Sequence, residues 1–316
     1  MKSFWRDLPK PIYALAPMEA VTDTVFRRVI NYCGRPTVYF TEFTNVDGLF
    51  SKGASKVDHR LLFQIEEKPL IAQLWGMDLE NYKKAAEKCA QAGFDGIDIN
   101  MGCPEKNVVK RGACAGLINN PQLAAQIIAA VKSGAGDLPV SVKTRIGIKE
   151  IETEKWISFL LEQSIDALTV HLRTAREMSA VTPHWEELPK IVELRNKISP
   201  NTVLLANGDI ESRKEAQEIV EKYKIDGVMV GRGIFKNPFL FAGSKRIEDL
   251  TLTERMDLLL MHSTLFHNEW GDSKHFDILK KFYKIYTLGL PNAGEIREKL
   301  MATRNYEEVK AAVESL

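Results

Sequence analysis

The residue that can carry chemistry most directly is Cys103, which stands between Gly102 and Pro104. A glycine and a proline around it predict a sharp turn in a loop, which would present the thiol where functional groups concentrate. With Lys106 nearby, the thiol can act as an acid that donates a proton. The alternative is a buried free thiol, which is the commonest fate of a cysteine. From the sequence, the role of Cys114 stays open.

Polar side chains follow several other apolar runs. Lys143 ends such a run, and a lysine that points into an enclosed mouth needs an anionic partner. That partner can be the N1–C2 edge of a reduced flavin, or a carboxylate such as Asp98 or Asp209. His171 can hydrogen-bond the same flavin edge. Two side-chain amides in equivalent places can bind a planar heterocycle, and they belong to Gln73 and Asn100.

Glycines mark the ends of the last two apolar runs. Gly208 follows Asn207, and Gly231 and Gly233 flank Arg232. Backbone N–H groups in such turns can point at phosphate oxygens, and the guanidinium adds a bidentate charge. The alternative is that these are ordinary turn glycines. Because the loops after the seventh and eighth strands of an α/β barrel often bind phosphate, we expect a phosphate site here.

Short apolar runs of strand length must position these residues. They lack polar–apolar alternation, which is typical of strands buried on both faces of a parallel sheet. There are eight of them, at residues 12–16, 38–43, 70–75, 96–99, 140–143, 167–170, 203–206 and 227–230. Most gaps carry helical patterns, as at residues 79–92, 121–132, 153–163 and 212–223, whereas the gap after the second run reads mostly as loop.

This alternation predicts an α/β fold, a (β/α)8 TIM barrel, with a doubly wound open sheet as the structural alternative. The alternation stops near the Asn237-Pro238 step, and the tail is all helical at residues 254–269, 276–286, 293–301 and 306–315. We therefore expect a barrel domain at residues 1–245 and a small helical domain at residues 246–316. A barrel of about 250 residues with such a tail fits the length of the chain.

The composition is that of an ordinary globular protein. The chain has 316 residues, 45% hydrophobic and 27% charged, with a net charge of +1, so any polyanion must bind to a local patch. The four cysteines form no C-x-x-C pair, so we expect neither a zinc site nor another metal site. No apolar run approaches the roughly 20 residues of a membrane span, and residues 1–10 do not resemble a secretory signal. We expect a soluble, cytoplasmic protein.

Taken in order, the motifs at the ends of the runs resemble those of the flavin-dependent tRNA-dihydrouridine synthase family, over essentially the full length. The set is LAPM at 15–18, VTD at 21–23, TE at 41–42, INMGCP at 99–104, VKTR at 142–145, HLRT at 171–174, NGDI at 207–210 and GRG at 231–233. Each motif is weak by itself, whereas the ordered set, one per strand, is strongly specific.

The resemblance implies a barrel that holds FMN and a helical domain that helps to bind tRNA. It implies that NADPH reduces the flavin, that hydride reaches C6 of a specific D-loop uridine, and that Cys103 protonates C5. Candidate FMN-binding residues are Pro17, Met18, Gln73, Lys143, His171, Asn207, Gly208, Asp209, Gly231 and Arg232. Candidate substrate-binding residues are Asn100, which matches a family position near the base, and Arg145, Arg173 and Arg176. No obligate protein partner and no membrane are implied.

The chain also departs from the family pattern. A tyrosine is common where Ser179 stands, the tryptophan is preceded by Pro183-His184, and Cys114 interrupts a G-A-G-A-A-L loop. These departures concern how the uridine is held, and Cys114 is an alternative acid. Lysines in residues 274–284 can neutralise RNA phosphates, although a solvated amphipathic helix gives the same pattern.

Two further functions stay open. One is an FMN barrel that acts on a free pyrimidine, as dihydroorotate dehydrogenase does; such an enzyme needs no helical tail. The other is an RNA-binding protein that has lost catalysis and uses the barrel as a scaffold.

Overall fold

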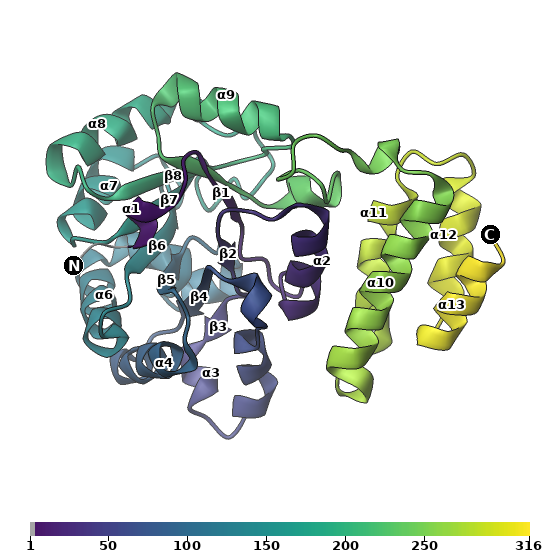
Figure 1. Cartoon of the computed structure of the whole chain (residues 1–316). Coiled ribbons are helices and arrows are strands. Elements are labelled where there is room, and N and C mark those ends of the chain that lie inside the picture. Colours follow the sequence, from purple (N-terminus) through teal and green to yellow (C-terminus); the bar gives the residue numbers. More distant parts are fainter. Residues whose placement is uncertain (1–3) are drawn as a thin grey trace.

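Parallel strands and helices alternate around a barrel, and a group of helices stands beside it (Figure 1). The structure is a computed structural model that describes residues 4–316. The strands are β1 Ile12–Leu15, β2 Tyr39–Phe40, β3 Thr44–Asn45, β4 Leu70–Trp75, β5 Gly96–Met101, β6 Val140–Arg145, β7 Ala167–His171, β8 Val203–Asn207 and β9 Gly227–Val230. The helices of the barrel part are α1 Phe4–Asp7, α2 Thr24–Gly34, α3 Val46–Leu49, α4 Leu79–Ala92, α5 Lys106–Lys110, α6 Pro121–Ala135, α7 Thr153–Glu162, α8 Leu188–Ile198 and α9 Arg213–Tyr223.

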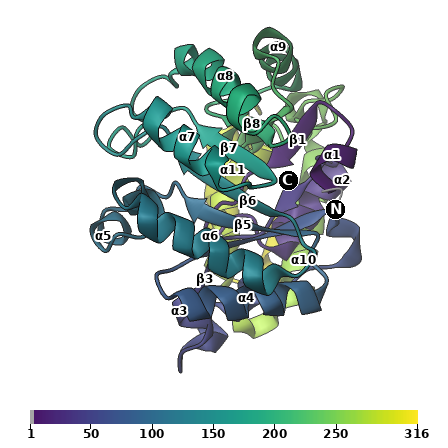
Figure 2. The ribbon, with the colours of Figure 1, turned by 90° about the vertical axis from the view of Figure 1, so that its left-hand side faces the viewer.

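Every strand pairing is parallel, in the order β1-β9-β8-β7-β6-β5-β4-β2, and β3 also pairs with β4. A bridge between Ala14 and Val38, with a 3.1 Å hydrogen bond from the Leu15 N–H to the Val38 carbonyl, joins β1 to the chain entering β2. The sheet therefore closes into the predicted (β/α)8 TIM barrel (Figure 2).

Of the second predicted run, residues 38–43, only β2 is strand; β3 begins just after the run, and both pair with β4. Between them the hydroxyl of Thr41, rather than a carbonyl, accepts the N–H of Gln73 at 3.1 Å. A side chain thus replaces one ladder bond and interrupts the strand. Elsewhere each predicted run contains a strand, which confirms the eight strand positions of the barrel.

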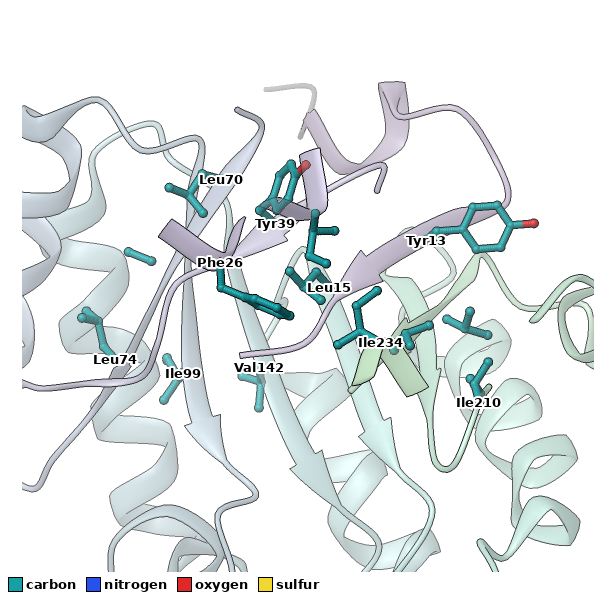
Figure 3. Close-up of a cluster of buried hydrophobic side chains, with 14 of the residues drawn as sticks. Tyr13, Leu15, Phe26, Tyr39, Leu70, Leu74, Ile99, Val142, Ile210 and Ile234 are labelled. Carbon is teal, nitrogen blue, oxygen red and sulfur yellow. The ribbon is translucent and has the colours of Figure 1, made fainter. Parts of the chain in front are cut away.

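Strand residues alternate between two buried layers, as expected for a covered parallel sheet. On β1, Tyr13 and Leu15 face the surrounding helices, and Leu15 belongs to the large cluster in Figure 3. Ile12 and Ala14 face the barrel interior, in a smaller cluster with Phe40. The same alternation on β4 to β9 points polar residues inward near the carboxyl ends of the strands, and this positions the site.

The helices between the strands follow the predicted patterns closely. Helix α4 matches its predicted bounds and ends at Gly93, whose φ of +83° closes the helix in a left-handed conformation. Ser212 caps α9 as expected by accepting from the Glu215 N–H. Helix α6 continues to Ala135, beyond the predicted end, because Gly134 fits against α4: a Cβ there would lie 2.2 Å from the Lys83 carbonyl oxygen.

The C-terminal helices are α10 Leu252–Trp270, α11 Tyr283–Thr287, α12 Ala293–Ala302 and α13 Tyr306–Glu314. The predicted helix 276–286 is instead a 3₁₀ helix, Phe276–Phe282, followed by α11. Three residues per turn align Phe276, Leu279 and Phe282 on one face. Phe282 stacks on Phe26 of α2 with ring centroids 4.7 Å apart, so this face docks the helical segment on the barrel.

Polar contacts reinforce this junction. The indole N–H of Trp270 and the ammonium of Lys274 both donate to Asp23 Oδ2, each at 3.1 Å. In residues 4–316, no helix is long and apolar enough to cross a membrane. The N-terminal stretch that does not resemble a secretory signal, residues 1–10, is described only from residue 4. Within it, Phe4–Asp7 form α1.

Candidate active site

The inward-facing residues at the carboxyl ends of the strands surround one cavity of about 630 Å³. Strand pairing sets Asn100 beside Lys143 and His171 beside Asn207, so side chains from different strands meet there. Sequence-predicted residues that line the cavity are Pro17, Met18, Lys143, Arg145, His171, Asn207, Gly208, Asp209, Gly231 and Arg232. The cavity is also lined by Ala16, Pro104, Ile210 and Gly233, which belong to the motifs quoted above, and by Ser179, where a tyrosine is common in the family. Residues lining it that the sequence did not indicate are Met178, Glu211 and Lys236.

The end of the cavity formed by the loops after β8 and β9 is built mainly from backbone. Gly208 has a φ of +155°, and a Cβ on it would lie 2.8 Å from Pro183 Cγ, so only glycine fits. At Gly231 a Cβ would have no neighbour closer than 3.8 Å, which leaves the backbone open toward the cavity. The guanidinium of Arg232 is exposed here and donates to Ser179 Oγ at 3.2 Å. The arrangement suits an anion such as a phosphate.

Asp209 brings a carboxylate to this end, but two guanidinium groups neutralise it. Arg173 pairs with its Oδ2, and Arg232 donates to its Oδ1 at 2.8 Å. The hydrogen bond from Arg173 is the main reason that the pKa of Asp209 lies below its usual value, although burial opposes the shift. Two cations share one carboxylate, so the loop retains positive charge for a bound anion.

Lys143 lines the cavity and has no ion pair among the described residues. Its Nζ is 3.3 Å from Asn207 Oδ1, and the Asn207 amide in turn donates to the Met229 carbonyl at 2.8 Å. Burial, with the nearby charge of Arg145, lowers the pKa of Lys143 to about 8. Neither carboxylate considered as an alternative partner pairs with it. An unpaired cation in a cavity fits a ligand that carries or develops negative charge.

Asp98, one of those carboxylates, is fully buried and serves a different purpose. It accepts from Gln73 Nε2 at 2.7 Å and from Ser141 Oγ at 2.6 Å. Burial raises its pKa to about 6. Asp98 therefore fixes the Gln73 side chain rather than the lysine.

His171 stays neutral at the cavity wall. Burial, together with the charges of Arg145 and Lys143, lowers its pKa well below the usual value. Its Nε2 is 3.2 Å from a guanidinium nitrogen of Arg173. Because a guanidinium only donates, Nε2 accepts, and the proton is assigned to Nδ1. The ring thus retains one N–H donor for another partner.

The two amides predicted to bind a heterocycle are linked to each other and to the cysteine turn. Asn100 Nδ2 donates to Gln73 Oε1 at 3.0 Å. Asn100 Oδ1 accepts from the N–H of Gly102 at 3.1 Å and of Cys103 at 2.9 Å. Gln73 is fully buried, and neither amide belongs to the residues that line the cavity. In this structure the pair holds the turn that presents Cys103, which the sequence did not reveal.

Cys103 is half-buried beside this turn. A hydrogen bond from the Cys114 thiol, and to a lesser extent the Glu105 N–H and the charge of Arg145, lower its pKa to about 6, although burial opposes them. Lys106, the cation that the sequence placed nearby, is exposed on α5. The charge next to the thiol therefore comes from the strand β6 residue rather than from its own loop. Cys33 and Cys89 are buried.

The three arginines predicted to contact RNA differ in position. Arg145 is buried and donates to the carbonyls of Gly102 at 2.9 Å, Thr174 at 2.9 Å and Met178 at 3.0 Å, which braces the loops around the thiol. Arg173 is buried and bonded to Asp209 and the Val181 carbonyl. Arg176 is exposed beside a second cavity of about 330 Å³, whose other cations are Lys106, Lys110 and Lys149.

The fold and the site define a class first. A closed parallel barrel whose strand ends carry an anion-binding loop pair, a free buried cation and an activated thiol is that of a barrel oxidoreductase. Comparison with known proteins then specifies the family. Residues 14–316 match the model described as dihydrouridine synthase (Dus).

Relatives align over nearly all of both chains. A probable tRNA-dihydrouridine synthase of Staphylococcus aureus (strain MRSA252) is 47% identical over 99% of this chain and 95% of its own length. A probable tRNA-dihydrouridine synthase 2 of Bacillus subtilis (strain 168) is 44% identical over 99% and 96%. The chain belongs to the dihydrouridine synthase family, and is thus a flavin-dependent oxidoreductase that acts on CH–CH groups.

Solved structures support the fold. A variant of morphinone reductase in complex with tetrahydroNAD has a TM-score of 0.53 at 13% identity, covering 74% of this chain and 85% of that chain. The old yellow enzyme homologue from Zymomonas mobilis has a TM-score of 0.50 at 15% identity, covering 75% and 89%.

Proposed function

We propose that this protein reduces the C5–C6 double bond of a D-loop uridine in tRNA, using FMN as cofactor and NADPH as electron donor. The observation that carries the proposal is one cavity lined by an anion-binding loop pair and by Lys143, which has no ion pair among the described residues, with Pro104, the residue after Cys103, also in its wall. Membership of the dihydrouridine synthase family supports the reaction.

The residues present fit FMN. Its phosphate would bind at the backbone of Gly208 and Gly231 beside Arg232, where Gly208 has no room for a Cβ and Gly231 leaves its backbone open toward the cavity. Lys143 and the Nδ1–H of His171 would face the edge of the ring system that gains negative charge on reduction. When bound and reduced, FMN supplies the hydride for C6.

Cys103 would supply the proton for C5. The turn is fixed by Asn100 Oδ1 on two N–H groups, so the thiol is presented in one place. Arg145 and the Cys114 thiol stabilise the thiolate that remains after the proton has left. Stabilisation of the product anion is what a proton donor of weak intrinsic acidity requires.

Transfer RNA would bind along the junction of the barrel and the helical segment. A cavity of about 810 Å³ lies there, and the cations lining it are Arg213, Lys214, Arg232, Lys236, Lys245, Arg246, Lys281 and Lys284. The carboxylates lining it are only Glu211 and Glu248. Such an excess of local positive charge suits a phosphate backbone, even though the chain as a whole is near neutral.

Only some of the lysines in residues 274–284 are free to contact an RNA phosphate. Lys274 is bound to Asp23, Lys280 pairs with Asp277 at 2.6 Å, and Lys281 donates to the Ala20 carbonyl. Lys284 lines the cavity and has no ion pair among the described residues. It is therefore the lysine of this segment with the best access to a phosphate.

Position-resolved nucleoside mass spectrometry of tRNA from cells with and without the gene tests the proposal. We expect dihydrouridine to disappear at a D-loop position and to return when flavin-loaded protein, NADPH and unmodified tRNA are combined. Turnover of a free pyrimidine without any activity on tRNA would instead establish the small-molecule enzyme. A purified protein that stays colourless after FMN is added would overturn the flavin assignment.

A further inference from the structure

The thiols of Cys103 and Cys114 form a pair that the proposed reaction only partly uses. The Ala115 N–H donates to the Cys103 carbonyl at 3.3 Å, which sets Cys114 beside Cys103, and each thiol shifts the pKa of the other. Cys103 lies in the loop after β5, and Cys114 begins the 3₁₀ helix Cys114–Asn119. The loop after β5 and the start of the 3₁₀ helix thus meet at these two cysteines.

The two sulfurs differ in access. Cys103 is half-buried, and its neighbour Pro104 lines the active-site cavity, so a small solute can approach the thiol from there. Cys114 is 1% exposed, behind Cys103. The other two cysteines, Cys33 and Cys89, are buried in α2 and α4.

The backbone at Cys114 is in a conformation that a cysteine seldom adopts. Its φ of +50° lies in the left-handed region, which favours glycine and disfavours residues with a Cβ. A non-glycine residue held there costs about 1 kcal/mol or more.

We propose that Cys103 and Cys114 are a reversible redox pair, in which a hydroperoxide oxidises Cys103 and Cys114 converts the product into an intramolecular disulfide. In the first step the Cys103 thiolate attacks the hydroperoxide, the O–O bond breaks, and Cys103 becomes a sulfenic acid while a hydroxide or alkoxide leaves. In the second step the sulfur of Cys114 displaces the hydroxyl, and the Cys114 proton leaves with it as water. The sulfurs give up two electrons, which the hydroperoxide accepts.

Charge determines the direction of the two steps. The hydrogen bond from Cys114 and the charge of Arg145 favour the thiolate of Cys103, which is the nucleophile in the first step. The same hydrogen bond, together with burial, raises the pKa of Cys114, so it stays a thiol until its partner has been oxidised. Cys103 is also the more accessible of the two sulfurs, whereas Cys114 is 1% exposed, so Cys103 is the peroxidatic sulfur and Cys114 the resolving one.

The disulfide would protect the site. A lone thiolate at this position would continue to the sulfinic acid, which thiols do not reverse, whereas a disulfide returns to two thiols on reduction. While the bond exists, Cys103 has no proton to donate, so dihydrouridine formation would stop; this consequence rests on the proposed function.

Mass spectrometry of the flavin-loaded protein tests the pair directly. After one equivalent of hydrogen peroxide near neutral pH, free thiols are blocked with iodoacetamide and the protein is digested with trypsin without reductant. We expect a linked peptide pair, residues 89–106 with residues 112–132, lighter by two hydrogens than the sum and separated by dithiothreitol. Fragmentation must place the bond at Cys103, because Cys89 shares its peptide.

Three variants complete the test. Cys114→Ala and Cys114→Gly should lose the linked pair completely and accumulate sulfinic acid at Cys103; glycine also relieves the left-handed backbone, so that variant should fold and retain flavin. Cys89→Ala is the matched control and should form the same link as the unchanged protein. Sulfinic acid at Cys103 in the unchanged protein, at the rate seen in Cys114→Gly and without a linked pair, would overturn the proposal.

An activity measurement separates this inference from the proposed function. Peroxide-treated protein should lose dihydrouridine formation and regain it with dithiothreitol, whereas treated Cys114→Gly should not regain it. A linked pair in a protein that never acts on tRNA would contradict the proposed function but not the redox pair.

Discussion

The two sides of the barrel mouth are built by different means. Beside β8 and β9, backbone conformation does the work: Gly208 and Gly231 leave N–H groups open, and Asp209 is neutralised by its arginines. Beside β4 and β5, a chain of side-chain hydrogen bonds positions the thiol. Asp98 accepts a hydrogen bond from Gln73, and Gln73 accepts one from Asn100. Asn100 in turn accepts from the N–H of Cys103 and holds its turn.

We expect this difference to separate cofactor binding from the chemical step. A backbone cradle has no titratable group of its own, so it holds an anion over a wide pH range. A thiol held by an amide chain and tuned by Arg145 and Cys114 changes its charge near pH 6. If the distinction is correct, changes on the β5 side should abolish turnover and spare the cofactor, and changes near the cradle should weaken the cofactor.

The largest expected effect is that of Cys103→Ala. Loss of a positioned general acid should lower the rate of product formation about 100-fold or more. The flavin should stay bound and remain reducible by NADPH, because the thiol lies outside the anion cradle. Single-turnover kinetics with prereduced enzyme and tRNA, beside flavin absorbance during NADPH addition, measures the two steps separately. Normal turnover by Cys103→Ala would leave Cys114 as the acid, and it would contradict the expectation that the Cys103 turn carries the chemical step.

The reverse pattern is expected for Lys143→Ala. Removing the unpaired cation should weaken FMN binding roughly 10- to 100-fold, by analogy with the loss of a charge-assisted hydrogen bond of about 1.5–3 kcal/mol. Fluorescence titration of the apoprotein with FMN gives the dissociation constant, and stopped-flow absorbance gives the rate of flavin reduction. Lys149→Ala, on an exposed lysine away from the cradle, is the matched control. Equal affinities would show that Lys143 does not act on the cofactor.

The sequence predicts the barrel well because each strand is short, apolar and followed by a polar or glycine residue. Hydrophobic runs of this kind are buried on both faces in any barrel, so their identity as strands depends little on distant context. The residues of the cradle were predicted for the same reason: the position of Gly208 and Gly231 after the last strands is itself the signal.

The β5 side was harder to predict because its contacts depend on the register between neighbouring strands. Nothing in the sequence says that Gln73 faces Asp98 or that Asn100 bonds back to the Cys103 turn. The burial of Arg145 was missed because residues 174–178 fold back over it and offer carbonyl oxygens. Long-range packing, not local residue type, determined these outcomes.

The pH dependence of product formation tests the β5 side by a shift in the profile rather than by a loss of activity. Because Cys103 must be protonated to act as the acid, and its pKa is lowered to about 6, product formation should fall as the pH rises through that value. Removing the strongest cause of the lowering with Cys114→Gly should move this falling limb to higher pH. The variant should then be faster than the unchanged enzyme on the alkaline side.

Cys114→Ser provides the control for that profile. A hydroxyl at this position still donates a hydrogen bond, so the limb should stay closer to its original pH than in Cys114→Gly. Single-turnover rates across the pH range, with flavin content normalised, give the three profiles. Three identical limbs would show that the thiol pair does not control the acid.

The smallest expected effect lies away from both sides of the mouth, in the helical segment. Lys284 lines the positively charged cavity at the junction, so Lys284→Ala should weaken tRNA binding modestly and reduce the slope of log K against log salt concentration by about 1. Lys310→Ala, on exposed α13 and outside that cavity, is the matched control and should change neither quantity. Filter binding over a salt series measures both.

Several other cations line the same cavity, so the loss of one lysine should weaken the affinity for tRNA without altering the chemical step. The single-turnover rate at saturating tRNA should therefore stay the same. A change in that rate would mean that the helical segment also positions the uridine, and binding and chemistry would then no longer be separable by region.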